Sequence, residues 1–147
     1  MAVYWDTSCV LKLYCPESES DSETYLGKLE SAVAPPVSSV LLATELHFAF
    51  QQKFRRNETA GRKPEQLIRR FQTDVGKGRF QLIPLDDDIH QEARRICRLC
   101  YDRPDPIGLR TLDGLHLATA TLASCREVVT TDERMSLAMP LLGLQAG

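Results

Sequence analysis

The sequence predicts an α/β protein with a mainly parallel sheet. Short apolar runs rich in strand-forming residues alternate along the chain with longer segments whose apolar residues have helical spacing. The 147 residues, of which 43% are hydrophobic, suit one ordinary domain with a substantial core. No repeat, low-complexity tract or linker divides the sequence. We therefore expect a single domain over residues 1–147.

Strands and helices are expected in turn from the first residues onward. The predicted strands lie at residues 2–5, 34–39, within 76–85, and at 128–131. The predicted helices lie at residues 8–17, 18–32, 40–56, 66–75, 86–102 and 112–124, with a short helix and a tail in 136–147. Ser18 or Ser20 is expected to cap the second helix, and Ser38 or Ser39 the third, because a side-chain oxygen there accepts a backbone N–H.

The composition argues against a membrane-spanning or secreted protein. Charged residues make up 26% of the chain, and no apolar run approaches the roughly 20 residues of a membrane-spanning helix. The opening residues MAVYWDTSCV lack the basic segment and long apolar stretch of a secretory signal. A cytoplasmic protein is the expectation.

The five cysteines match no disulfide framework. Cys97 and Cys100 form a C-x-x-C pair, a spacing found in redox sites and in half of many zinc sites. They fall within a segment of amphipathic helical spacing, and no second pair supplies two further zinc ligands. We expect reduced cysteines on a helix.

A basic segment lies inside an acidic protein. The net charge is −2, yet residues 53–79 contain nine basic and three acidic residues, a net charge of +6. Such a run is either a solvated helix face or a platform for the phosphate backbone of a nucleic acid. Charge alone leaves both interpretations open.

Four acids occupy positions that call for explanation. Asp6 and Asp132 each follow an apolar strand, and parallel sheets form their sites outside the carboxyl ends of the strands. Glu45 falls in the middle of the apolar face of its predicted helix, where a lone carboxylate is costly and needs a partner such as a metal ion or an Arg. Asp113 opens an apolar helix, where it would also complement the helix dipole. His116, one turn later, is expected to pack between helices, with an approach to the same site as the alternative.

Clustered carboxylates suit a hard divalent cation. Mg²⁺ and Mn²⁺ take oxygen ligands, usually a few carboxylates and waters, and the cation offsets the repulsion between the acids. Such an ion can polarise a phosphodiester and activate water. No histidine pair, nucleophile elbow or phosphate-binding glycine loop competes with this interpretation.

Four segments together resemble the PIN domain family, specifically the VapC-type ribonuclease toxins of toxin–antitoxin pairs. They are VYWDTSCVLKLYCPE around Asp6, SSVLLATELHFAF around Glu45, RTLDGLHLATA around Asp113 and VVTTDERM around Asp132. They come in the family's order and span nearly the whole chain.

The resemblance implies a three-layer α/β/α fold and a metal-dependent endoribonuclease that uses Mg²⁺ or Mn²⁺. Asp6 and Asp113 would be the principal metal ligands, and Glu45 and Asp132 would complete the pocket directly or through waters. Thr130 matches a position that often hydrogen-bonds near the acids. We expect in-line attack of metal-activated water on RNA, leaving a 5′-phosphate and a 3′-hydroxyl.

The resemblance also implies a homodimer and a separate VapB-like antitoxin whose tail blocks the acidic pocket. The segments after Asp6 and after Ser20 would supply the dimer interface. Two other functions stay open: a housekeeping RNA-processing or DNA-directed nuclease, and a non-catalytic interaction module. The second is disfavoured because the chain keeps all four acids.

Overall fold

The computed structural model describes residues 2–147 and has an all-parallel sheet of five strands in the order β3-β2-β1-β4-β5. The strands are β1 (Val3–Trp5), β2 (Val37–Ser39), β3 (Gln81–Ile83), β4 (Glu127–Val129) and β5 (Gln145–Ala146). The helices are α1 (Thr7–Tyr14), α2 (Glu19–Glu30), α3 (Leu41–Arg55), α4 (Pro64–Gly76), α5 (Asp87–Tyr101), α6 (Thr111–Leu122) and α7 (Glu133–Ala138), followed by the 3-10 turn η1 (Met139–Leu142).

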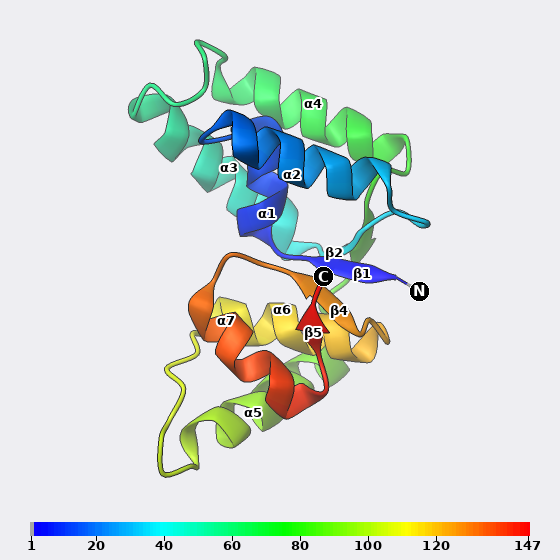
Figure 1. Cartoon of the computed structure of the whole chain (residues 1–147), viewed down its shortest axis with the longest axis vertical. Coiled ribbons are helices and arrows are strands. Elements are labelled where there is room, and N and C mark those ends of the chain that lie inside the picture. The colour runs from blue at the N-terminus through cyan, green and yellow to red at the C-terminus, as the bar shows by residue number, and fades with distance from the viewer. Residues whose placement is uncertain (1) are drawn as a thin grey trace.

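Helices cover both faces of the sheet, so the predicted three-layer α/β/α arrangement is confirmed. Helices α1–α4 lie on one side of the strands and α5–α7 on the other (Figure 1). Because successive side chains of a strand point to opposite faces, β1 contributes to two cores. Tyr4 packs with the core under α5–α7, and Trp5 packs with the core under α1, α3 and α4. Of the helices within residues 2–147, none has the length and apolar character to cross a membrane.

Strand β1 is central, and its carboxyl end lies beside that of β4. Tyr4 pairs with Val128 and Trp5 with Val129, and the backbone N–H of Asp6 continues the ladder to the carbonyl of Val129 at 3.2 Å. The two strands that precede Asp6 and Asp132 are therefore neighbours. Their following loops open on the same edge of the sheet.

The ends of the elements differ from expectation at two places. Ser18 caps α2 as predicted, accepting from the backbone N–H of Asp21. Val40 occupies the cap position of α3 instead of a serine, although the Ser39 hydroxyl still accepts from the N–H of Leu41 at 3.1 Å. The expected C-terminal tail contains strand β5, which pairs with β4 at the edge of the sheet.

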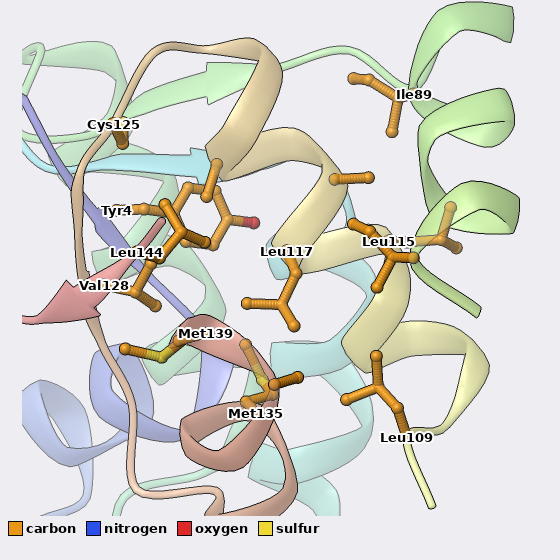
Figure 2. Packing of buried hydrophobic residues seen from close by; sticks show 14 of the residues in the cluster. Tyr4, Ile89, Leu109, Leu115, Leu117, Cys125, Val128, Met135, Met139 and Leu144 are labelled. Atoms are coloured by element: carbon orange, nitrogen blue, oxygen red, sulfur yellow. The ribbon is translucent and has the colours of Figure 1, made fainter. Parts of the chain in front are cut away.

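A hydrogen bond inside the core joins β1 to α6. The Tyr4 hydroxyl lies 2.6 Å from Nδ1 of His116, and both side chains are at most 2% exposed. Apolar side chains such as Val128, Leu117 and Leu144 belong to the same core cluster as the Tyr4 ring (Figure 2). Burial accordingly raises the pKa of the Tyr4 hydroxyl, so this group stays protonated. His116 is thus a packing residue of α6, as expected, but one that also binds a buried hydroxyl.

Changing Tyr4 to Phe should lower the free energy of unfolding by about 1–3 kcal/mol, because Nδ1 of His116 loses its buried partner. In a protein that already carries His116→Leu, Tyr4→Phe should lower the free energy of unfolding clearly less, since both polar partners are then absent. Urea unfolding of the four proteins of this double-mutant cycle measures the coupling. Equal costs in the two backgrounds would show that the bond contributes nothing to stability.

Candidate active site

Asp6 is the most buried of the four acids and the most firmly held. It lies directly after β1 at 4% exposure and caps α1 by accepting from the N–H of Cys9 at 3.2 Å. The hydroxyl of Ser8 donates to Oδ1 and that of Thr130 to Oδ2, both at 2.6 Å. Donors on both carboxylate oxygens fix the orientation of the side chain.

The loop after β4 reaches Asp6 through Thr130. The Thr130 hydroxyl donates to Asp6 and accepts from the backbone N–H of Asp132 at 3.0 Å. Asp132 in turn caps the short helix α7 by accepting from the N–H of Met135 at 2.9 Å. The neighbouring Thr131 hydroxyl lies 3.0 Å from that of Ser8. Thr130 therefore has the position beside the acids that the sequence motif predicted, and it ties Asp132 to Asp6.

The hydrogen-bond partner of Glu45 is a histidine, whereas the sequence suggested a metal ion or an Arg. Its Oε1 lies 2.6 Å from Nε2 of His116 and accepts from the Thr7 hydroxyl at 2.8 Å. Burial alone would raise the pKa of Glu45, but the hydrogen bond and charge of His116 and the hydroxyl of Thr7 outweigh it and hold the pKa below its ordinary value. Glu45 is only partly buried, so its second oxygen can take another ligand.

The Asp113 carboxylate is held by one hydrogen bond. It stands in the first turn of α6, where Oδ2 accepts from the backbone N–H of Arg110 at 3.2 Å. Partial burial raises the pKa of Asp113, and the negative charge of Asp132 raises it further. The two carboxyls therefore repel each other across the loop after β4 and the start of α6. A cation between them would relieve that repulsion.

A hydrogen-bonded hydroxyl links Asp6 to the backbone of Asp132, and charge couples Asp132 to Asp113. Glu45 is held separately, by Thr7 and His116. Among residues 2–147, no three acidic, histidine or cysteine side chains are arranged closely enough to hold a metal ion as they stand. The donors are nevertheless of the kind that Mg²⁺ or Mn²⁺ selects, namely carboxylate oxygens. No Lys or Arg of the described residues forms an ion pair with Asp6, Asp113 or Asp132. The donor set thus fits a divalent cation.

The sequence did not single out Thr7 and Ser8, which hold Glu45 and Asp6. They are the two residues after Asp6, so the hydroxyl pair in the segment DTS was the available signal. His116 was considered only as an alternative, and its place one turn after Asp113 was the clue. Its two partners, Tyr4 and Glu45, come from distant parts of the chain.

Ion pairs hold two side chains of the basic segment, residues 53–79, in place. Lys53 is buried between Glu17 and Glu58, with its ammonium group 3.1 and 3.0 Å from their carboxylates. Arg79 pairs with Asp74, and Arg70 lies over the ring of Tyr14. Lys53 and Arg70 thereby connect α3 and α4 to the N-terminal part of the chain. The other basic residues of the segment are exposed, on α3, on α4 and in the turns next to them, and both earlier interpretations remain for those residues.

The C-x-x-C pair is structural, as predicted. Cys97 and Cys100 both lie on α5 as free thiols, Cys97 exposed and Cys100 buried. The three other cysteines are also free and buried.

Comparison with known proteins places this geometry in a family. Residues 3–138 match the PIN domain. Ribonuclease VapC46 of Mycobacterium tuberculosis (strain ATCC 25618 / H37Rv) is 30% identical over 145 residues, which cover 97% of this chain and 94% of that protein.

Solved structures share the fold over almost the whole chain. A toxin–antitoxin complex from Klebsiella pneumoniae has a chain that is 18% identical, with a TM-score of 0.66 over 99% of this chain and 97% of that one. VapBC2 from Rickettsia felis, bound to a DNA fragment from its promoter, has a chain that is 15% identical, with a TM-score of 0.66 over 99% and 98%. The chain has a five-stranded parallel sheet, and residues 3–138 match the PIN domain. The chain therefore belongs to the PIN domain family.

Proposed function

We propose that the protein is a Mg²⁺- or Mn²⁺-dependent endoribonuclease and acts as the toxin of a toxin–antitoxin pair. The observation that carries the proposal is Asp6, a buried carboxylate with no basic partner among the described residues, linked through hydroxyls to a further acid at the same sheet edge. Burying a carboxylate is costly without a compensating positive charge. A divalent cation supplies it without an ion-pair partner from the protein.

Asp6 and Asp113 would be the principal ligands of that cation, and Glu45 and Asp132 would complete the pocket directly or through waters. When bound, the cation polarises a phosphodiester and lowers the pKa of a water molecule. The chain's own contribution is orientation. Ser8 and Thr130 hold the Asp6 carboxylate, and His116 and Thr7 hold that of Glu45, so two ligands are in place before the cation arrives.

The biological role rests on the relatives. The name of the mycobacterial protein describes a ribonuclease, and the similar solved chains come from toxin–antitoxin complexes. We infer that RNA is the substrate, that a VapB-like antitoxin on a separate chain is the partner, and that the protein forms a homodimer. The acidic pocket would then accept a basic side chain of the antitoxin in the inhibited state.

Changing Asp6 to Asn should abolish RNA cleavage while the fold is kept. Asn remains a good cap for α1, so the loss arises from the missing charge at the cation site. Because the cation's charge stabilisation is worth several kcal/mol and about 1.4 kcal/mol is tenfold in rate, we expect a loss on the order of 100-fold or more. Cleavage of total RNA with Mn²⁺, followed by mapping of the new 5′ ends, measures it.

Glu30→Gln is the matched control, because Glu30 is an exposed acid at the end of α2. It should cleave as the unchanged protein does. Circular dichroism of both variants establishes that they are folded. Undiminished cleavage by the folded Asp6→Asn protein would refute the proposed site.

Changing Asp113 to Asn should stabilise the metal-free protein at neutral pH. Since the pKa of Asp113 is raised in the folded state, its ionised form costs stability; the cost is absent below the ordinary Asp pKa and grows as the pH rises through the raised value. Asn keeps an acceptor for the Arg110 N–H but has no charge for Asp132 to repel. Urea unfolding in EDTA as a function of pH measures the difference.

The stability gain of Asp113→Asn should disappear in acid, where both proteins are uncharged at this position. Added Mn²⁺ should also narrow the gap, because only the unchanged protein binds the ion well. Asp113→Asn that is less stable than the unchanged protein at neutral pH would contradict this account of Asp113. So would a difference in free energy of unfolding that changes with neither pH nor Mn²⁺.

A further inference from the structure

A hollow of about 570 Å³ lies between α5 and α6, next to the candidate active site. Its floor is apolar and includes Leu109 and Leu115, two core residues that Figure 2 shows at the side of α6 that faces α5. Its rim carries Arg94, Tyr101 and Arg110. The volume falls in the range of about 300–1,000 Å³ that is typical of small-ligand sites.

The hollow is positively charged in a protein that is acidic overall. Arg94 and Arg110 are exposed, and neither forms an ion pair with any of the described residues. No acidic residue lines the hollow. Two unpaired guanidinium groups over an apolar floor match a ligand that combines a planar apolar part with phosphate.

An aromatic ring is fixed at the rim. The Tyr101 hydroxyl donates to the backbone carbonyl of Leu109 at 2.9 Å, which anchors the end of α5 to the loop before α6. The residue is nevertheless 48% exposed. An exposed ring held in one place is suited to stacking on a nucleobase, an interaction that tolerates every base.

The hollow is continuous with the acids. Arg110 on its rim donates its backbone N–H to the carboxylate of Asp113. Thr111 and Gly114, the residues on either side of the 112–113 segment, also line it. A molecule in the hollow would therefore lie along the same first turn of α6 that presents Asp113.

We propose that this hollow binds one unpaired nucleotide of the RNA substrate, beside the phosphodiester that is cleaved. The base lies against Tyr101 and Leu115, and Arg94 and Arg110 bind the adjoining phosphates. The inference rests on the proposed ribonuclease function and adds a requirement for a single-stranded nucleotide next to the cleavage point, because a paired base cannot enter the hollow. A second copy of the chain is the competing occupant, but an acid-free rim with two unpaired arginines favours a polyanion.

Cys97 provides a reporter for occupancy. It lines the hollow and is the one exposed cysteine of the five. Alkylation by a maleimide should therefore modify Cys97 selectively. In EDTA, where no cleavage occurs, a short single-stranded RNA of mixed sequence should slow this alkylation, and a fully paired duplex of the same length should not.

Arg94→Ala and Tyr101→Leu should each weaken binding of that RNA on the order of tenfold, the usual effect of losing a phosphate contact or a stacking ring. Tyr101→Phe keeps the ring but loses the hydrogen bond to Leu109, so it should bind better than Tyr101→Leu. Arg98→Ala is the matched control, because Arg98 lies one turn further along α5 and is likewise exposed but lines a different hollow. Fluorescence anisotropy of labelled RNA in EDTA measures all four.

Three outcomes would overturn the inference. RNA that binds Arg94→Ala and the unchanged protein equally, or that leaves the alkylation rate of Cys97 unchanged, occupies another surface. Protection of Cys97 that increases with protein concentration and needs no RNA identifies the hollow as an interface between two copies. RNA cleavage in Mn²⁺ distinguishes the two proposals. If RNA is cleaved but does not protect Cys97, only the subsite is refuted. If RNA protects Cys97 but is not cleaved, only the ribonuclease function is refuted.

Discussion

A line of hydrogen bonds from Tyr4 through His116 to Glu45 connects the hydrophobic core to the candidate active site. Both ring nitrogens of His116 are used, one by a buried hydroxyl of β1 and the other by the carboxylate of α3. The line crosses from the central strand to α6 and on to α3, so three elements share one polar connection. A carboxylate on an otherwise apolar helix face is acceptable only with such a partner. The position of Glu45 therefore depends on the packing of α6 against the sheet.

The site combines fixed and adjustable acids. Asp6 is fixed by hydroxyl donors on both oxygens, and Glu45 by His116 and Thr7. Asp113 and Asp132 serve as first-turn and cap residues of their helices, and burial together with the charge of Asp132 raises the pKa of Asp113. Asp6 and Glu45 would define where a cation binds, and Asp113 would gain free energy when it arrives. Catalytic groups are commonly held in this way, at some cost to the stability of the empty protein.

Much of the fold could be predicted because local signals and topology agree. The alternation of strands and helices predicted the parallel sheet, and Asp6 and Asp132 met at one edge because their strands are neighbours. Strand β5 could not be predicted, because two residues are too few to show a strand's alternating pattern. They form a strand through their pairing with β4. The two hydrogen-bond partners of His116 could not be predicted, because they lie 112 and 71 positions away in the sequence. Nothing local distinguishes it from an ordinary packing histidine, and the same holds for the hollow between α5 and α6.

The central claim is that the hydrogen-bonded acids at this sheet edge form a site for one or more divalent cations. A crystal soaked in Mn²⁺ tests it most directly, because anomalous scattering locates the metal without reference to activity. We predict a peak between the carboxylates of Asp6 and Asp113, with Asp132 turned toward it. A peak confined to another acidic stretch, such as residues 86–88 at the start of α5, or no peak at all in an intact fold, would contradict the account.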